Sequence, residues 1–238
     1  MRIETKKLYD FIKKSTMNGS IPTTYIEISK EGLKSKVKDI SNICLTEVIL
    51  NKEIFNEEMY GKVYVKNAKM FMDVLKTFGE EVELSKIDDY TLSIKGDDVK
   101  RKADIIMGSD LIVDNIIEGD VPNIPTVRDF LVEKKVLSKV LSDVSLLKIN
   151  EITIQTDNNR LLFTVGSEKE SDVLSTYIDI ESGEDVKVSI GAYMKDLNDS
   201  FETNSQINIK LANNVPAVFE EQTEDMKFTC IIAPIVHS

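Results

Sequence analysis

The residues of this chain whose types could support catalysis are three adjacent pairs of carboxylates. They are Glu80-Glu81, Asp88-Asp89 and Asp97-Asp98. Paired carboxylates can hold a divalent cation or act as general acid and general base. Each pair lies at a predicted turn or strand edge, where neighbouring side chains of a strand point to opposite faces. Solvated turns are the better interpretation, and an enzyme is kept only as an alternative, because no GxGxxG, GxSxG or P-loop pattern is present.

Histidine and cysteine chemistry is nearly excluded by position and number. The single histidine, His237, is next to the C-terminus. The two cysteines, Cys44 and Cys230, lie inside strand-like apolar runs and form no CxxC pair. We expect them to be buried thiols of a reducing compartment, and we expect neither a metal site nor a cofactor.

The composition limits the class of protein. The 238 residues are 42% hydrophobic, which is enough for one extended core or two small ones. No apolar run approaches 18 residues and no charged-then-apolar leader is present, so we predict a cytoplasmic protein without a membrane span or secretory signal. The net charge of −11 normally argues against a nucleic-acid partner, because phosphates favour clustered Lys and Arg. The distribution of the 30 basic residues therefore matters more than their number.

These lysines are sorted onto predicted helices. At 100° per residue, lysines seven apart share a helix face, and apolar residues form the opposite stripe. The faces are Lys6, Lys7, Lys13 and Lys14 on Thr5–Ser15, Lys66, Lys69 and Lys76 beside Asn67–Phe78, and Lys135 and Lys139 on Glu133–Val144. The fourth predicted helix, Ala192–Glu202, instead carries Asp196, Asp199 and Glu202 around Lys195. Basic helices in an acidic protein favour a sheet whose helices, on one face, are turned toward a polyanion.

The elements that position these lysines repeat at a constant offset. The segment Val63-Tyr64-Val65, followed by Lys69-Met70, reappears as Val188-Ser189-Ile190 followed by Met194-Lys195 (188 − 63 = 125). The repeated pattern is strand, helix and three strands, and its period is about right for a small domain. We therefore predict one duplicated fold of two similar lobes, residues 1–109 and 126–238. The acidic, irregular stretch 110–125 between them contains Pro122 and Pro125 and is predicted to be a connector.

Alternating or continuous apolar runs predict the strands of both lobes. In the first lobe these are Tyr25–Ile28, Ile43–Leu50, Gly61–Val65, Glu81–Lys86, Tyr90–Lys95 and Ala103–Met107. In the second lobe they are Glu151–Gln155, Leu161–Val165, Val173–Ile180, Val186–Ile190, Gln206–Leu211, Ala217–Glu221 and Phe228–Ile232.

Several segments, taken in order, resemble a sliding clamp of the proliferating cell nuclear antigen (PCNA) type, closest in style to the archaeal forms. The end Cys230-Ile231-Ile232-Ala233-Pro234 is similar to the family's apolar-Leu-Ala-Pro ending. Further family segments are resembled by four stretches of this chain: Gly32 through Leu50, Ile124-Pro125, Lys187 to Asn198 and Asn213-Asn214-Val215-Pro216-Ala217. The resemblance covers essentially the whole chain. No single motif makes it specific, but the order and spacing of these segments together do.

The resemblance implies a fold and a function. The fold is α+β, a duplicated two-lobed clamp with antiparallel sheets outside and two helices per lobe lining a pore. The family forms rings, commonly trimers, around double-stranded DNA. It is not an enzyme but a processivity factor in DNA replication and repair, which tethers DNA polymerase and other proteins that carry short clamp-binding motifs. A clamp loader and a nucleoid-associated location follow from the same resemblance. Lysines that reach phosphates without reading bases suit contact that is blind to sequence.

The resemblance also implies site residues. The lysines predicted to bind DNA are Lys6, Lys7, Lys13, Lys76 and Lys139 by family position, with Lys14, Lys69 and Lys135 added from the helical wheel. The partner pocket would use Ile43, Leu45, Pro122, Ile124, Pro125, Pro216, Ile231, Ile232, Ala233 and Pro234. Lys38 and Asn42 replace the family's Met and His beside this pocket, which makes that rim more polar and more positive. The subunit interface would pair the strand of Ala103, Ile105 and Met107 with that of Val173, Ser175 and Tyr177 in a second copy.

One alternative keeps the fold but changes the function. A clamp-like adaptor or inhibitor of the replication machinery would contact a clamp or its loader without encircling DNA. The acidic fourth helix keeps this alternative open, because a pore-lining helix should be basic.

Overall fold

The structure, a computed structural model, describes residues 1–52, 59–97, 100–109, 117, 122–166, 172–191 and 194–235. The chain divides into two compact units. Unit 1 comprises Met1–Ser41, Leu45–Gly119 and Gln222–Phe228, and unit 2 comprises Asn42–Cys44, Asp120–Glu221 and Thr229–Ser238. Most of the predicted connector lies outside the described residues, so the connector and the lobe boundaries stay predictions.

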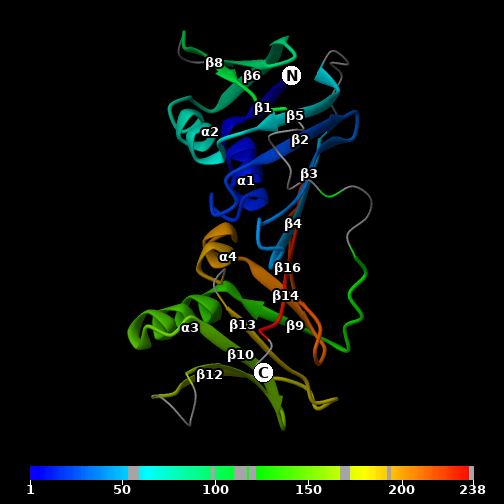
Figure 1. The fold of residues 1–238 in the computed structure, drawn as a ribbon, viewed down its shortest axis with the longest axis vertical. Coiled ribbons are helices and arrows are strands. Elements are labelled where there is room, and N and C mark those ends of the chain that lie inside the picture. Colours follow the sequence, from blue (N-terminus) through cyan, green and yellow to red (C-terminus); the bar gives the residue numbers. More distant parts are fainter. Residues whose placement is uncertain are drawn as a thin grey trace. The chain divides into compact units, whose positions relative to one another are not determined.

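Unit 1 contains two sets of antiparallel strands and two helices that pack against each other (Figure 1). One set has the order β1-β6-β7-β8 and the other the order β5-β2-β3-β4. The strands are β1 (Arg2–Glu4), β2 (Thr24–Ser29), β3 (Gly32–Lys38), β4 (Cys44–Asn51), β5 (Gly61–Val65), β6 (Glu81–Asp88), β7 (Thr91–Gly96) and β8 (Lys102–Ile106). The helices are α1 (Thr5–Ser15) and α2 (Ala68–Leu75).

Unit 2 repeats this plan. Its first set of strands has the order β9-β14-β15-β16 and its second the order β13-β10-β11-β12. The strands are β9 (Arg128–Glu133), β10 (Glu151–Asp157), β11 (Arg160–Val165), β12 (Leu174–Asp179), β13 (Lys187–Gly191), β14 (Gln206–Leu211), β15 (Ala217–Gln222) and β16 (Met226–Ile232). The helices are α3 (Lys134–Leu147) and α4 (Met194–Ser200), which contact each other.

The predicted duplication is confirmed, and it holds at the level of strand register. Glu83 lies opposite Lys95 across β6 and β7, and Asn208 lies opposite Glu220 across β14 and β15. Both residues of the second pair follow their counterparts by the same number (208 − 83 = 220 − 95 = 125). Because register as well as element order is repeated, the two units are copies of one fold.

Apolar stripes at helical spacing hold the helices in each unit. In α1 the side chains of Leu8, Phe11 and Ile12 are fully buried, and in α3 those of Leu137 and Val140 are. These residues recur three and four apart, which places them on the face turned to the core. The opposite face of each helix is thereby left for the lysines.

Strands β4 and β16 are neighbours, and each contributes residues to both units. In unit 1, the amide of Asn51 donates to the carbonyl of Asp225 at 2.8 Å. In unit 2, the Sγ atoms of Cys44 and Cys230 lie 3.5 Å apart, and both cysteines are buried thiols, as predicted. Burial raises the pKa of the Cys230 thiol, which disfavours its thiolate.

The sequence missed three strands. These are β1, β3 and β9, of which β1 has only three residues. In β3 the lysines 34, 36 and 38 alternate with Leu33, Ser35 and Val37, so its apolar face is too sparse to be recognised by periodicity. Helix α2 is also shorter than the predicted Asn67–Phe78, because Asn67 is its N-cap and accepts a hydrogen bond from the Met70 amide at 2.9 Å. By contrast, α1, β5 and β14 have the predicted bounds.

Candidate nucleic-acid and partner surfaces

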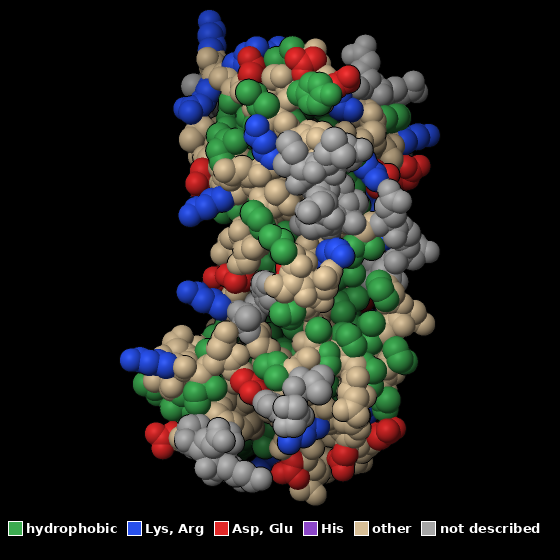
Figure 2. Space-filling model, viewed as in Figure 1, with side chains coloured by type: hydrophobic (Ala, Val, Ile, Leu, Met, Phe, Trp, Pro, Cys, Tyr) green, Lys and Arg blue, Asp and Glu red, His purple; other side chains and the backbone are tan. Residues whose placement is uncertain are grey.

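Helix α1 presents part of its predicted basic face to solvent. Lys6 is exposed, while Lys7 and Lys13 are half-buried. In Figure 2, blue Lys and Arg side chains project from the side of unit 1 on which the helices lie. This face can therefore approach an anion without any change in the core beneath it.

Lys14 is a correction to the predicted basic face. Its side chain is only 2% exposed, and its Nζ lies 5.5 Å from the centre of the Phe228 ring. The helical wheel placed Lys14 with Lys7 correctly but could not show that the beginning of β16 covers that flank of α1. Lys14 therefore has a structural role in unit 1 and is not available to a phosphate.

Several of the predicted DNA-binding lysines are already neutralised by carboxylates of the chain. The Nζ of Lys7 lies 2.5 Å from Asp225 and 3.2 Å from Glu4, and its hydrogen bonds to Asp225 and then Glu4 raise its pKa. The other pairs are Lys76 with Asp73 (3.0 Å), Lys135 with Glu133 (2.5 Å) and Lys139 with Asp143 (3.5 Å). A lysine in such a pair must exchange its carboxylate for a phosphate.

Three of the predicted lysines differ from these. Within the part of the chain that the structure describes, no ion pair is found for Lys6, Lys13 or Lys69. All three lie in unit 1, on α1 and α2. Unit 1 consequently offers the stronger attraction for a polyanion, and no periodicity in the sequence could have revealed this difference.

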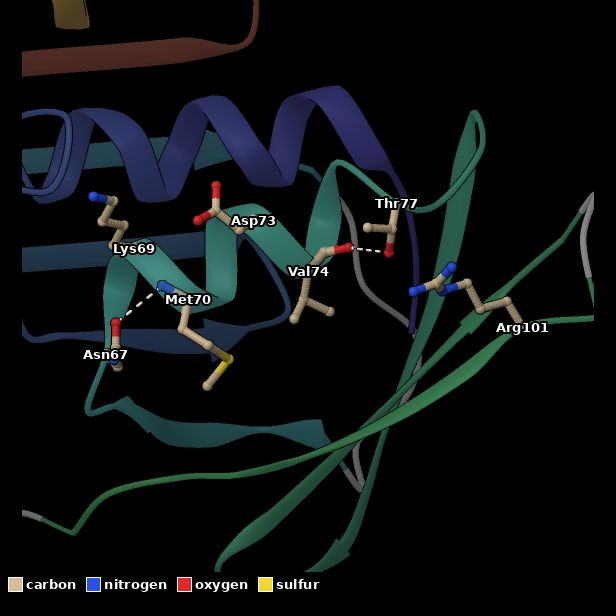
Figure 3. A pocket seen from close by; sticks show the side chains of 7 residues that line it. All are labelled: Asn67, Lys69, Met70, Asp73, Val74, Thr77 and Arg101. Atoms are coloured by element: carbon tan, nitrogen blue, oxygen red, sulfur yellow. Dashed lines mark hydrogen bonds between the residues drawn. The ribbon is translucent and has the colours of Figure 1, made fainter.

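The solvent face of α2 forms a hollow with a second basic group (Figure 3). Lys69 and Met70 line it from the helix, and Arg101 reaches it from the segment between β7 and β8. The guanidinium carbon of Arg101 lies 5.6 Å from the centre of the Phe78 ring, which fixes its place by a cation–π contact. Sequence reasoning missed Arg101 because it follows an acidic turn and lies outside any predicted helix.

A second hollow lies between the beginning of α1 and the end of α2. It is lined mainly by apolar parts of Tyr9, Leu75 and Phe78, with Lys6 and Lys76 also contributing. The Nζ of Lys76 lies 5.5 Å from the centre of the Tyr9 ring. Its hydrogen bond to Asp73, and next the nearby Tyr9, raise the pKa of Lys76, so this lysine is charged at neutral pH.

In unit 2 the helical surface is less basic. Lys135 and Lys139 are exposed on α3, and Lys195 is exposed on α4 beside the half-buried Asp196 and Asp199. The hydroxyl of Ser138 and the amide of Asn198 lie within 3.4 Å, which holds α4 against α3. Asp196 and Asp199 therefore lie on the same packed pair of helices as the lysines of α3, whereas Glu202, predicted for the same helix, lies beyond its end at Ser200.

The predicted partner residues fall into accessible and inaccessible groups. Asn42, Ile43, Pro122 and Pro125 are exposed, and Lys38, Leu45, Ile124, Pro216, Ala233 and Pro234 are half-buried. Ile231 is 7% exposed and Ile232 is fully buried, so these two predicted pocket residues offer little surface to a partner. Neighbouring side chains of a strand point to opposite faces, so the burial of both residues shows that both faces of this part of β16 are covered. Ala233 and Pro234, which follow the strand, are half-buried and remain partly accessible.

The structure brings together one part of this predicted surface. The Ala233 amide donates to the Ile43 carbonyl at 2.8 Å, so the segments around these two residues are adjacent in unit 2. Sequence reasoning missed Ile40, which is 82% exposed at the turn between β3 and β4. The Asp39 carboxylate closes this turn by accepting from the Ser41 amide at 3.0 Å.

The predicted interface strands are the outer strands of their sets. β8 pairs with β7, and β12 pairs with β11. Tyr177 and Ser175 of β12 are exposed and Val173 and Ala103 are half-buried. The side chains of Ile105 and Met107 are buried in unit 1, and Ile106 between them is 64% exposed. The prediction that these strands form an interface stays open.

Comparison with solved structures decides the fold. A. fulgidus PCNA, solved with the C-terminal region of FEN-1 bound, matches 100% of this chain and 98% of that chain with a TM-score of 0.80 and 17% identity. PCNA from Thermococcus kodakaraensis matches 98% of both chains with a TM-score of 0.81 and 17% identity. The chain has the fold of a PCNA-type sliding clamp.

Two further comparisons extend this clamp likeness. The chain is 22% identical over 229 residues to the DNA polymerase sliding clamp of Methanococcus vannielii and 23% identical over 235 residues to that of Methanococcus maripaludis, covering 89% of both chains in each case. A PCNA2–PCNA3 complex from Sulfolobus tokodaii matches with a TM-score of 0.73 and 16% identity. No protein-family model matches the chain.

The described part of this clamp fold holds neither a membrane span nor a metal cluster. None of the described helices is long and apolar enough to cross a membrane. Among the described residues, no group of three or more His, Cys, Asp or Glu side chains is placed to hold a metal ion.

Proposed function

We propose that this chain is a DNA polymerase sliding clamp, a ring that encircles duplex DNA and tethers polymerase and other replication and repair proteins. The observation that carries the proposal is the likeness to PCNA clamps over 98–100% of the chain at TM-scores of 0.80 and 0.81. Relatives named DNA polymerase sliding clamp support it over 89% of the chain. In this role the protein has no catalytic activity of its own and works in the cytoplasm, associated with the nucleoid.

The lysines on the helices are the groups that would face DNA. Lys6, Lys13 and Lys69 lead this set, supported by Lys7, Lys76, Lys135 and Lys139. Lysine is a mobile point charge rather than a bidentate fork, which suits contacts that are broken and remade as the ring slides. These contacts add to affinity without reading sequence.

The surface around Ile43 and Ala233 would receive partner proteins. A clamp of this fold has been solved with the C-terminal region of FEN-1 bound, which supports a site for short segments of partners on this chain as well. The accessible apolar groups here are Ile43, Ile124 and Pro234. Apolar anchors buried in such a surface typically supply most of a peptide's affinity.

A topological assay tests the proposal. The clamp and a clamp loader are incubated with nicked circular DNA, and the protein that remains on DNA after gel filtration in high salt is measured. Salt screens ordinary contacts with phosphates, so only a ring threaded on DNA should stay. Cutting the circle once with a restriction enzyme should release it.

The same assay separates the clamp from a clamp-like adaptor. Retention on circles and loss from linear DNA requires encirclement. Equal retention on both, or none on either with the loader active on a known clamp, would leave the adaptor as the better function. A variant with Glu at Lys6, Lys13 and Lys69 serves as control, since it should fold normally and load poorly.

A further inference from the structure

The hollow between the beginning of α1 and the end of α2 has the size and the lining of a ligand site. Its volume is about 430 Å³, within the range of pockets that hold small ligands. Among the side chains that line it, the rings of Tyr9 and Phe78 are half-buried and Leu75 is fully buried. A helix that only contacts phosphates needs charge on its surface and no apolar hollow beside it. Phosphate contacts alone therefore do not explain this hollow.

The walls of the hollow are held in place by contacts within unit 1. The Thr5 amide donates to the Glu80 carbonyl at 2.8 Å, which joins the first residue of α1 to the segment after α2. The Phe78 amide donates to the Leu75 carbonyl at 3.0 Å, and the guanidinium carbon of Arg101 lies 5.6 Å from the centre of the Phe78 ring. Because the aromatic surface is already ordered, a ligand would bind it at a small cost in entropy.

A polar group that lines the hollow lacks a partner. Thr5 is 8% exposed, and its hydroxyl oxygen has no hydrogen-bond partner among the described residues. Buried polar groups without a hydrogen bond are rare in folded proteins, because each costs free energy. Rotation about the Cα–Cβ bond moves this hydroxyl and leaves the backbone in place. A polar atom of a bound ligand could therefore supply the missing bond.

The charged side chains around the hollow favour an anion. Lys6 is exposed and shows no ion pair within the described part of the chain, and Lys76 is exposed and pairs with Asp73 at 3.0 Å. The Nζ of Lys76 lies 5.5 Å from the centre of the Tyr9 ring. Glu80 also lines the hollow, so two ammonium groups stand against one carboxylate. A fitting ligand joins an apolar ring to an anionic group.

We propose that this hollow holds an unpaired nucleotide of single-stranded DNA. Its base contacts the rings of Tyr9 and Phe78, as bases stack on aromatic side chains in proteins that bind single strands. Its phosphates contact Lys6 and Lys76, and a polar atom of the base bonds the Thr5 hydroxyl. Duplex DNA does not fill this site, because its bases are stacked inside the helix. The site goes beyond the proposed function and does not require a closed ring.

A strand without bases separates contact with the base from contact with phosphate. Fluorescence anisotropy is measured on the full-length protein with a labelled oligothymidylate and with an abasic strand of the same length and charge. The parent should bind the oligothymidylate roughly ten-fold more tightly, the effect of one stacked base. Equal affinities would overturn the site, because phosphate contacts treat the two strands alike.

Substitution of Tyr9 assigns this preference to the hollow. Tyr9→Ala should nearly abolish the preference for the strand with bases, whereas Tyr9→Phe, which retains the ring, should keep it. Affinity of Tyr9→Ala for a duplex of the same length should be nearly unchanged. Tyr90→Ala, at a tyrosine that is 61% exposed between β6 and β7, is the matched control and should bind like the parent. A preference retained in a folded Tyr9→Ala variant, or lost in Tyr9→Phe, would overturn the assignment.

The Thr5 hydroxyl gives a readout that a purely structural role would not. Thr5→Val removes the unpartnered hydroxyl at nearly the same shape, so it should raise the thermal midpoint of the free protein. The same variant should bind the oligothymidylate several-fold more weakly and the abasic strand as the parent does. A gain in stability together with a loss in affinity supports the site. Unchanged affinity for the oligothymidylate would remove Thr5 from it.

Competition distinguishes a strand from a free nucleotide. Thymidine monophosphate, at the same concentration of nucleotide, should displace the labelled strand roughly ten-fold less well, because it brings no neighbouring phosphate to the lysines. Equal displacement would overturn single-stranded DNA as the occupant. Retention on circular DNA reports separately on the proposed function, and Tyr9→Ala should still be retained. Loss of base preference with retention on circles, and the reverse, are therefore distinguishable failures.

Discussion

At the scale of single residues, the candidate DNA contacts are decided by which lysines already have a carboxylate. The net charge argued against a nucleic-acid partner, and family position together with the helical wheel predicted eight DNA-binding lysines. The structure divides them. Lys14 is buried, Lys7, Lys76, Lys135 and Lys139 are paired, and Lys6, Lys13 and Lys69 show no ion pair among the described residues.

This division predicts unequal effects on binding to DNA. Replacing Lys6, Lys13 and Lys69 together by Ala should make the plot of log K for DNA binding against log salt less steep. The magnitude of its negative slope should fall by about 0.9 for each phosphate that is no longer neutralised. Alanine at Lys7, Lys76 and Lys135 should change the slope less, because each of these lysines already neutralises a carboxylate of the chain and so neutralises less phosphate. Fluorescence anisotropy on duplex DNA at several salt concentrations measures both slopes, with Lys30→Ala in the β2–β3 turn as control. Equal slopes for the two triple variants would contradict the division.

Asp199 on α4 predicts the opposite effect, a gain in affinity for DNA on substitution. Asp199 is half-buried on the packed pair α3–α4, and a carboxylate turned toward phosphates opposes binding. Asp199→Lys should therefore tighten binding to duplex DNA, with Asp199→Asn intermediate. If Asp199→Lys weakens association while circular dichroism shows a folded protein, α4 does not face DNA.

At the scale of elements, sequence periodicity predicts what is amphipathic and misses what is short or covered. It predicted α1, β5 and β14 with their observed bounds and placed the duplication at the correct offset. It missed β3, whose lysines alternate with Leu33, Ser35 and Val37, and it did not show that Ile232, which the resemblance put in the partner pocket, is fully buried. Burial by a neighbouring strand is a tertiary property, so a single helix wheel or strand pattern does not contain it.

The N-cap of α2 predicts a local loss of stability. The Asn67 side chain satisfies the Met70 amide at 2.9 Å, and losing such a cap typically costs about 1 kcal/mol. Asn67→Ala should lower the free energy of unfolding by that amount, whereas Asn67→Ser and Asn67→Asp, which can still accept the bond, should retain most of it. Chemical denaturation of the three variants is the measurement. A loss for Ser and Asp equal to that for Ala would show that the cap does not stabilise α2.

The buried Tyr25 side chain on β2 predicts that the free energy of unfolding falls at high pH. Burial, and next the nearby Glu27, raise the pKa of the β2 residue Tyr25 from 10.0 to about 12. Since the folded pKa is higher, its contribution is fully present below pH 10 and is lost as pH rises toward 12. Tyr25→Phe should remove this part of the decline, whereas Tyr90→Phe, on an exposed tyrosine, should not. Denaturation midpoints at about pH 9, 10 and 11 give the comparison, and parallel declines in both variants would contradict it.

At the scale of the whole molecule, each copy of the duplicated fold has an outer strand that pairs on one side only among the described strands, β8 in unit 1 and β12 in unit 2. In the ring proposed for this chain, pairing between copies would cover these edges. Beside the predicted partner pocket, the chain differs from the family pattern at Lys38 and Asn42. We therefore expect its selectivity among partner peptides to differ from that of the family.

The polar rim of the partner surface predicts a preference among peptides. Peptides carrying a Gln-x-x-apolar-x-x-aromatic-aromatic motif should bind through Ile43, Ile124 and Pro234, whose apolar groups remain accessible. With the same anchors, acidic flanks should bind several-fold more tightly than basic flanks at low salt. Charges at a rim act mainly on association rate and selectivity, so this difference should shrink as salt rises.

Two variants separate the rim from the anchors in a calorimetric titration of both peptides. Lys38→Glu should reverse the preference for acidic flanks. The mean binding free energy of the two peptides should stay nearly unchanged, because their apolar contacts are the same. Ile43→Asp should weaken both peptides at least ten-fold, because it puts a charge where an anchor is buried. Equal affinity of the parent for the two peptides at low salt would remove Lys38 from recognition. Unchanged binding in Ile43→Asp would move the partner site away from this surface altogether.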